Sequence, residues 1–309
     1  MSTGVYDKTA GDLINDALRA ANITGTDMPV EASDFANGFT CLNDVLFAMQ
    51  AEQIHIWTET EAFLPMTANT QVYTLGASGD HCFTDYKFTT VSAIALSGAT
   101  TIDVGSTAGM TAGDNIGIEL DDGTRQWTTI DTVTDSDTLV LTDGLTDDVS
   151  VDATVYAYTT GIDQPVRILS ARYADSFTTD EMPSSQISRD EYFNQPSKST
   201  TGAMNSWYYS RQLSAGKFYV WPVAGNVRNL IRFTFIKPQY IPDDQSENIL
   251  IPPEWYLPLK LKVAAELGLI YAIDPEKQVM LEQKAQIYMD KALGIDNEFS
   301  SFSFHPCNS

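Results

Sequence analysis

Histidine and cysteine are the side chains in this sequence best suited to nucleophilic or metal chemistry. There are three of each, namely His55, His81, His305, Cys41, Cys82 and Cys307. None of them has the His-x-x-x-His or Cys-x-x-Cys spacing that a metal site uses. His81 and Cys82 are adjacent, but neighbouring side chains usually point in different directions, which disfavours a catalytic pair. The sequence therefore predicts no catalytic residue, no metal site and no cofactor.

Carboxylates are abundant, with 41 Asp and Glu against 18 Lys and Arg, for a net charge of −23. A pair of carboxylates can hydrolyse a glycosidic bond, so a cell-wall (peptidoglycan) hydrolase remains an alternative. Acidic runs such as 131–137 lack the ligand order and the sharp-turn glycine of a calcium loop. An acidic surface repels phosphates, which disfavours sequence-specific DNA binding but suits a conduit for DNA.

Aromatic and basic residues are concentrated between residues 161 and 250. The run Trp207-Tyr208-Tyr209 could stack on a sugar ring, so a carbohydrate-binding β protein is a third alternative. The basic residues could form an electropositive belt that meets an acidic neighbour, or they could protect strand edges. Both interpretations stay open for the basic residues of this region: Arg167, Arg172, Arg189, Lys198, Arg211, Lys217, Arg228, Arg232 and Lys237.

Helices are predicted at both ends of the chain. Apolar residues recur at helical spacing in 9–23 and 31–53, and again in 253–271 and 275–293. Thr9 and Asp12 have the spacing of a capping box. Pro258 is expected to delay or kink its helix, and Gly294 is expected to end the last one.

Between the helices the pattern is that of β-structure. Residues 58–75 indicate two strands around a turn, and 91–158 indicate short strands separated by Gly and Asp turns. Residues 165–237 continue as β-structure, with an antiparallel meander expected around Gly216 and Gly225-Asn226. The sequence thus predicts a mixed α+β fold, in which a helical core from both chain ends carries a long β insertion containing a small barrel or sandwich module. The expected parts are an N-terminal helical part (1–57), a β connection (58–90), an acidic β module (91–160), an aromatic-rich β region (161–250), a C-terminal helical part (251–293) and an extended tail (294–309).

Residues 11–64 resemble the start of the head-to-tail adaptors of short-tailed phages. These are also called tail accessory factors or packaged-DNA-stabilisation proteins, and are related to tail tubular protein A. Such proteins open with a helix, a turn and a helix carrying Leu-Asn-x-x-Leu, here Leu42 to Leu46, followed by a tryptophan, here Trp57. Later motifs resemble the family in the same order: 187–193 (ISRDEYF), 196–198 (PSK), Gly202, 207–209 (WYY), Arg211-Gln212, 219–222 (YVWP) and 251–255 (IPPEW).

The resemblance implies a structural subunit of the virion, not an enzyme. It implies a ring of twelve copies at the head–tail interface, assembled in the host cytoplasm and docked beneath the portal protein. Such a ring extends the DNA channel, retains packaged DNA, lets double-stranded DNA pass during packaging and ejection without specific binding, and attaches the tail nozzle or the fibre or spike proteins. No cofactor, substrate or membrane is implied, although cell-wall hydrolase activity has been attributed to proteins of this kind.

Two groups of residues are candidates for docking. Exposed phenylalanines in a polar tail favour aggregation, so the tail is expected to anchor first in the portal and otherwise in a neighbouring subunit; the alternative is that it folds back on its own helices. The tail residues concerned are Phe299, Phe302, Phe304 and His305. The subunit or tail interface candidates are Arg189, Tyr192, Trp207, Tyr208, Tyr209, Arg211 and Trp221.

Overall fold

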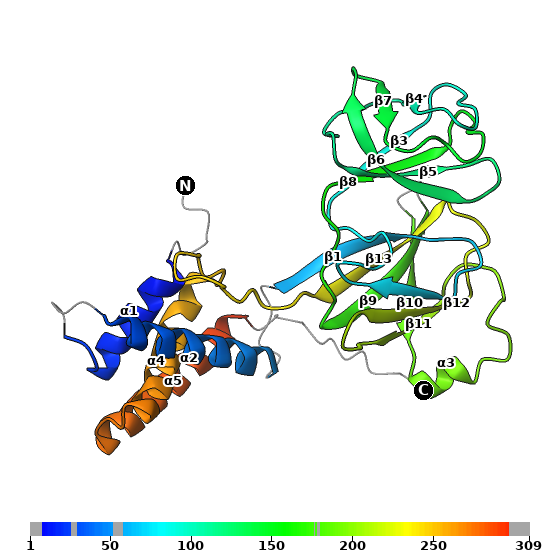
Figure 1. Cartoon of the computed structure of the whole chain (residues 1–309). Helices are drawn as coiled ribbons and strands as arrows, with labels where there is room; N and C mark the ends of the chain where they lie inside the picture. The colour runs from blue at the N-terminus through cyan, green and yellow to red at the C-terminus, as the bar shows by residue number, and fades with distance from the viewer. Residues whose placement is uncertain (1–7, 26–29, 52–57, 176, 178–179, 297–309) are drawn as a thin grey trace, which may run out of the picture. The chain divides into compact units, whose positions relative to one another are not determined.

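The computed structural model describes residues 8–25, 30–51, 58–175, 177 and 180–296. The described chain contains α-helices and two β-sheets, which confirms the mixed α+β class (Figure 1). It divides into two compact units, a helical unit made from 1–58 and 239–309, and a β unit made from 59–238. None of the described helices is long and apolar enough to span a membrane.

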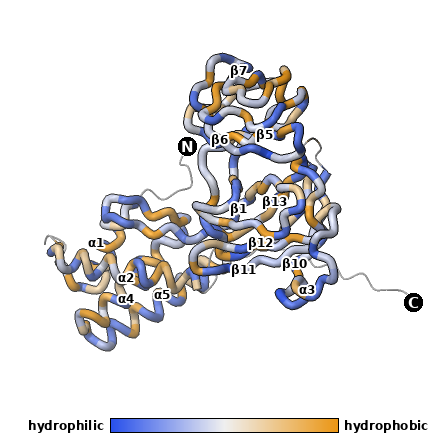
Figure 2. The backbone as a smooth tube through the Cα atoms, turned by 45° about the vertical axis from the view of Figure 1, so that its right-hand side comes forward, coloured by the Kyte–Doolittle hydropathy of each residue, from blue (hydrophilic) through white to orange (hydrophobic). Residues whose placement is uncertain are grey.

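The helical unit contains α1 (Ala10–Ala21), α2 (Ala32–Ala51), α4 (Pro253–Ile270) and α5 (Pro275–Asp296). The predicted capping box at the start of α1 is confirmed, because Asp12 N donates to Thr9 Oγ1 at 3.1 Å and Thr9 N donates to Asp12 Oδ2 at 3.3 Å. Each helix carries both hydrophobic and hydrophilic residues along its length (Figure 2). The hydrophobic ones can therefore pack together while the others remain in water.

One apolar core joins the helices of the two chain ends. Its fully buried side chains include Leu13 and Leu42 from the first half and Trp255 and Leu259 from the second. Polar contacts tie the same helices together: Tyr256 donates a hydrogen bond to Asp16 at 2.8 Å, and Tyr271 bonds Asp34. Neither end of the chain could bury its apolar face alone.

Two expectations about these helices are wrong. Helix α4 begins at Pro253 and includes Pro258, so this proline does not delay it. Pro258 has no N–H to donate to the carbonyl of Glu254, and the helix continues through it without that one hydrogen bond. Gly294 does not end α5, which continues to Asp296, and its φ is not positive.

The larger sheet of the β unit has seven strands in the order β1-β13-β9-β10-β11-β12-β2. Their bounds are β1 (Glu59–Pro65), β2 (Val72–Leu75), β9 (Arg167–Asp175), β10 (Glu181–Gln186), β11 (Ser206–Ser210), β12 (Gly216–Trp221) and β13 (Asn229–Ile236). Its core lies on one face and includes Trp207, Phe218 and Phe233.

This sheet differs from the predicted arrangement in two ways. The strands β1 and β2 form as expected from 58–75, but they do not pair with each other; they pair with β13 and β12 at opposite edges of the sheet. The antiparallel meander expected around Gly216 and Gly225-Asn226 forms only in part, because β11 and β12 pair antiparallel but β13 pairs with β1 and β9 and not with β12. In the same region β10 and β11 are parallel. Parallel neighbours need a longer connection than a hairpin, and the short helix α3 (Arg189–Phe193) lies within it.

The smaller sheet has six strands in the order β3-β8-β5-β6-β7-β4. Their bounds are β3 (Lys87–Thr90), β4 (Thr101–Asp103), β5 (Asn115–Glu119), β6 (Arg125–Val133), β7 (Thr138–Leu141) and β8 (Thr154–Tyr158). The edge strands β3 and β4 are joined by a bridge between Val91 and Val104. Backbone hydrogen bonds of Ser92 N to Asp103 O (2.9 Å) and Gly105 N to Thr90 O (2.8 Å) reinforce it, so the sheet closes on itself.

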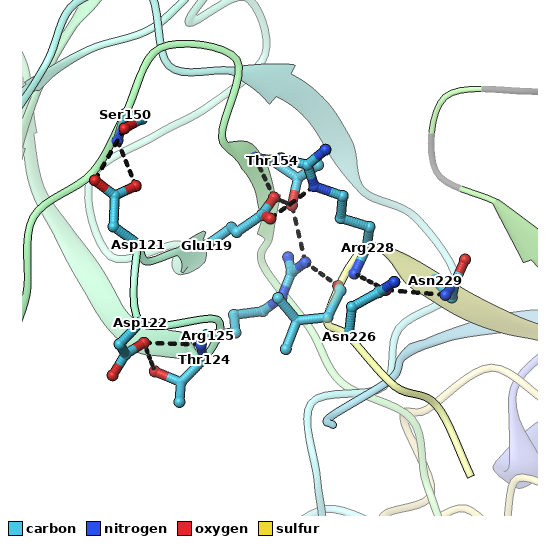
Figure 3. Close-up of polar contacts among 11 residues, drawn as sticks. Glu119, Asp121, Asp122, Thr124, Arg125, Ser150, Thr154, Asn226, Arg228 and Asn229 are labelled. Atoms are coloured by element: carbon cyan, nitrogen blue, oxygen red, sulfur yellow. Dashed lines mark hydrogen bonds and ion pairs between the residues drawn. The ribbon is translucent and has the colours of Figure 1, made fainter. Parts of the chain in front are cut away.

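The two sheets meet at a polar junction (Figure 3). Arg125 donates to Thr154 Oγ1 at 2.9 Å and to the carbonyl of Val227 at 2.6 Å, and its guanidinium lies 4.6 Å from the ring centroid of Tyr156. Beside it, Arg228 forms an ion pair of 2.7 Å with Glu119. The turn before β13 is thus attached to β5, β6 and β8.

We predict that Gly38→Ala destabilises the helical unit. A Cβ at Gly38 would lie 2.3 Å from Ile14 Cγ2, so α1 and α2 would have to move apart. Overpacking of this kind costs about 1–3 kcal/mol. Gly294→Ala is the matched control, because a Cβ there meets nothing within 4 Å; in a helix that change is neutral or stabilising by up to about 1 kcal/mol. Urea denaturation of both variants checks this, and equal stability would contradict the close approach of the helices.

We predict that the Glu119 ion pair makes stability depend on acid pH. Burial opposes ionisation of Glu119, but hydrogen bonds from Arg228 and Thr154 outweigh it and lower the pKa of this carboxyl below the ordinary 4.5. Such a group stabilises the fold above its unfolded pKa, and the contribution is lost as the pH falls through the folded pKa.

Glu119→Gln should therefore lower the free energy of unfolding at pH 7 by about 1–3 kcal/mol. Because Arg228 is half exposed, we expect the lower end of this range. The deficit should shrink as the pH falls below 4.5. Asp131→Asn, at an exposed acid of the same sheet, is the control. If Glu119→Gln lowers the free energy of unfolding equally at pH 7 and below pH 4.5, Glu119 stabilises the fold by packing alone.

Candidate docking surface

The interface candidates that the structure brings together lie on α3 and on the hairpin of β11 and β12. Helix α3 begins with a capping box, in which Glu191 N donates to Ser188 Oγ at 3.2 Å and Ser188 N donates to Glu191 Oε2 at 2.7 Å. Hydrogen bonds to the Glu191 carboxyl from Ser188, foremost from its backbone N–H, lower the pKa of that carboxyl. The short helix is thereby fixed in its connection.

Side chains on β11 alternate between the two faces of the sheet. Trp207 is 1% exposed in the core, whereas Tyr208 on the other face stacks on Tyr219 of β12 with ring centroids 5.5 Å apart. Tyr209 points to the same side as Trp207 and donates a hydrogen bond to the carbonyl of Pro165 at 2.7 Å. The hairpin thus presents Tyr208 and Tyr219, and not Trp207, on its outer face.

Helix α3 adds further rings to this face. Phe193 lies 5.6 Å from Tyr219 between ring centroids and is 45% exposed. Tyr192 lies 5.1 Å from Tyr219, but it is 1% exposed and supports the other rings from beneath. Its hydroxyl contacts the carbonyl of Gln71 at 3.4 Å.

Two cations border the exposed ring of Phe193. The guanidinium of Arg189 lies 5.4 Å from the centroid of Phe193, and the ammonium of Lys198 lies 5.8 Å from it. Lys198 also donates to the carbonyl of Phe193 at 2.9 Å, which holds the ammonium in place. We name the group Arg189, Phe193, Lys198, Tyr208 and Tyr219 the aromatic–cationic surface.

Some basic residues of the β unit form ion pairs with carboxylates, and others do not. Arg172 and Arg232 share Glu61 and Glu181, with Arg172 Nη1 3.1 Å from Glu181 and Arg232 Nη1 2.8 Å from it. Arg228 pairs with Glu119. Among the residues that the structure describes, Arg189, Lys198 and Arg211 form no salt bridge. Positive charge is therefore left uncompensated by ion pairs around α3 and the β11–β12 hairpin.

The remaining interface candidates fall elsewhere or serve the fold. Trp221 is half-buried and donates from Nε1 to the carbonyl of Ser197 at 2.8 Å, while Arg211 is exposed in the β11–β12 turn.

The expectation that Trp207 and Tyr192 lie at an interface is wrong, because both side chains are 1% exposed in the interior. Phe193 and Tyr219 are not among the predicted interface residues, and Lys198 is predicted only as one member of a possible electropositive belt. Strand alternation opposite Tyr208 and the capping box at Ser188 are the signals that could identify Tyr219 and Phe193. The tail residues Phe299, Phe302, Phe304 and His305 lie outside the described residues.

The carbohydrate-platform interpretation of 207–209 is also corrected. A sugar-stacking platform needs adjacent rings on one face, and Tyr208 points away from Trp207 and Tyr209 because successive strand residues alternate. The three rings therefore do not form one surface.

His81 and Cys82, the adjacent pair considered for catalysis, pack against other side chains of the fold. His81 stacks on Trp127 with centroids 3.9 Å apart and lies 2.7 Å from the hydroxyl of Tyr158. Cys82 is 2% exposed, and burial raises its pKa well above the ordinary value. A buried, protonated thiol is a poor nucleophile.

The paired carboxylates Glu61 and Glu181 serve as ion-pair partners. Although burial opposes ionisation, hydrogen bonds from Arg232 and Arg172 lower the pKa of Glu61. A general acid in glycoside hydrolysis needs the opposite shift. Among the described residues no group of three or more His, Cys, Asp or Glu side chains could hold a metal ion.

We predict that the buried and exposed aromatic residues of this region differ in their contribution to stability. Tyr192→Ala should lower the free energy of unfolding by about 3–5 kcal/mol, because it leaves a cavity under the other rings. Tyr208→Ala should cost about 1 kcal/mol, because its ring is partly in water and loses mainly the contact with Tyr219. Urea denaturation measures both. Similar losses for the two variants would contradict the division into supporting and presented rings.

Comparisons with known proteins do not assign this chain to a family. No family model matches the sequence, and no curated protein matches it. Among solved structures, the chain has a weak match to VP17, a capsid protein of bacteriophage P23-77. The match has 11% sequence identity and a TM-score of 0.12, and it covers 62% of this chain and 77% of that one. A TM-score of this size supports no argument about fold or function.

Proposed function

We propose that this chain is a structural connector subunit of a tailed-phage virion. In this proposal twelve copies form a ring under the portal protein at the head–tail interface, extend the DNA channel, retain the packaged DNA and provide the attachment site of the tail. The protein acts by binding other proteins and catalyses no reaction.

The observation that carries the proposal is the meeting of separate adaptor-like motifs at one surface. The motif 187–193 supplies α3, 207–209 supplies β11, and 219–222 supplies the end of β12. These segments follow one another between residues 187 and 222, and Phe193, Tyr208 and Tyr219 form one run of ring contacts. The resemblance thus concerns residues that act together, which supports a shared role in docking.

The composition of this surface suits a protein partner. Tyr, Phe and Arg are enriched in protein interfaces relative to the remaining surface. Cations held over aromatic rings add about 0.5–1 kcal/mol at exposed sites, and more when a partner excludes water.

The overall charge suits passage of DNA. A net charge of −23 leaves few cations to bind phosphates, so DNA would slide along the ring without being held. We further propose that the tail phenylalanines Phe299, Phe302 and Phe304 anchor each subunit to the portal, as the family resemblance implies.

Binding to the portal of the phage that encodes this chain tests the proposal. We expect the full chain to add to portal rings in multiples of 34.0 kDa and to appear in electron micrographs as a ring beneath the portal. Replacing the three tail phenylalanines with alanine should weaken this binding at least tenfold, with unchanged thermal stability. A peptidoglycan-digestion assay run in parallel tests the hydrolase alternative. A chain that does not bind the portal, or that digests peptidoglycan, would overturn the proposal.

A further inference from the structure

A second exposed patch lies in the loop between β3 and β4. Ala95 points inward at 7% exposed, whereas its neighbours Ile94 and Leu96 are 69% and 65% exposed. Ala95 exchanges both backbone hydrogen bonds with Val149, at 3.0 and 2.8 Å, so strand-like alternation turns Ile94 and Leu96 outward. We name Ile94 and Leu96 the apolar tip.

Hydrogen bonds hold this loop firmly. Ser97 N donates to Asp148 Oδ1 at 2.8 Å, Ser97 Oγ donates to the carbonyl of Thr146 at 3.2 Å, and Gly98 N donates to the carbonyl of Leu145 at 2.7 Å. Two large apolar side chains are thus presented to water on an ordered scaffold. Ordering costs little when such a loop binds a partner, because most of it is already fixed.

The surroundings of the apolar tip are acidic. Asp147 and Asp148 lie on the segment that faces the loop, and the backbone of Asp121 bonds that of Asp148 at 2.9 Å. Between Lys87 and Tyr158 there are twelve acidic residues and two basic ones, of which Arg125 is committed to the junction. Asp147 and Asp148 therefore place negative charge beside the apolar tip.

This patch complements the aromatic–cationic surface of the same chain. One offers two aliphatic side chains beside acidic residues. The other offers the exposed ring of Phe193 and the partly exposed rings of Tyr208 and Tyr219, with Arg189 and Lys198 beside Phe193. A single chain cannot join them, because the tip adjoins β4 and the aromatic–cationic surface lies on α3, at opposite ends of the β unit (Figure 1). The β unit thus has two complementary ends.

We propose that the occupant of the aromatic–cationic surface is a second copy of this chain, which packs its apolar tip onto the outer side of the rings. Each copy uses its tip on one neighbour and its aromatic–cationic surface on the other. Such a contact between different patches repeats around a ring when the rotation closes. The inference rests on the proposed function for the ring, and it adds which surfaces the copies use.

The size of the contact determines how it should behave. Two side chains with the residues beside them bury less than the roughly 800 Å² per partner of a standard interface. We therefore expect weak association of the free chain, weakened further by salt because the charges beside the tip are exposed. The portal would gather the copies and raise their effective concentration.

Charge reversal on each side provides the test. Arg189→Glu with Lys198→Glu makes the aromatic–cationic surface negative, and Ala93→Lys with Asp147→Lys places positive charge beside the tip. Ala93 and Asp147 are at least partly exposed. Sedimentation velocity of the full chain at low salt, and the number of copies bound per portal, measure the contact.

We expect each reversed variant alone to associate at least tenfold more weakly than the wild-type chain and to load fewer copies per portal. An equimolar mixture of the two should regain association, since the positive tip of one fits the negative surface of the other and the remaining pair is native. This recovery also shows that neither variant is misfolded. Lys284→Glu with Lys291→Glu, an equal charge change at exposed lysines of α5, is the control and should have no effect.

The outcomes separate this inference from the proposed function. If either reversed variant alone loads onto the portal as fully as the wild-type chain, or if the mixture does not recover, the contact is wrong while the connector role stands. If copies associate and the mixture recovers but the portal is not bound, the contact stands and the connector role fails.

Discussion

The antiparallel pairing of β1 with β13 is the constraint on which the rest of the architecture depends. Seven residue pairs align from Glu59 with Ile236 to Pro65 with Leu230. The first and last strands of the β unit are therefore neighbours, so the chain leaves the helical unit and returns to it at one place. This permits the two chain ends to form a single helical core although about 180 residues separate them. The loop entropy of joining distant segments is reduced because the sheet itself closes that loop.

At the junction between the two sheets, Arg125 fixes how the sheets are oriented at some cost in stability. Arg125 is held by Thr154, Val227 and Tyr156, yet its Nε and Nη1 atoms have no hydrogen-bond partner in the described part of the chain. Burial lowers its pKa to about 10, so it remains charged at neutral pH. A buried charge that is only partly bonded is costly, and an apolar junction could be more stable. An arginine that needs a carbonyl, a hydroxyl and a ring in fixed directions does, however, limit the orientations in which the sheets can meet.

Local patterns in the sequence predicted the helices well, because each helix signal is contained in one segment. The capping box of Thr9 and Asp12 and the apolar repeats of α1, α2, α4 and α5 are of this kind. Strand pairing is not local, so the separation of β1 from β2 and the parallel pair of β10 and β11 could not be found. The aromatic run 207–209 was treated as one surface, whereas the period of two divides it. The apolar tip has no local sequence signal for a related reason: the inward direction of Ala95 depends on Val149, a partner 54 residues away.

The acidic character of the smaller sheet has a structural origin as well as a consequence for binding. Its core contains aliphatic side chains and no aromatic ring, so its many turns need other stabilisation. Several aspartates supply it by accepting bonds from the backbone: Asp122 from Thr124, Asp135 from Thr138 and Asp148 from Ser97. Asp-rich turns are favoured for this reason, and a negative surface follows from them. Recognition by charge can thus arise from residues already required by the turns. Asp147, whose side chain bonds no described group, is a position at which charge can be changed with little effect on the fold.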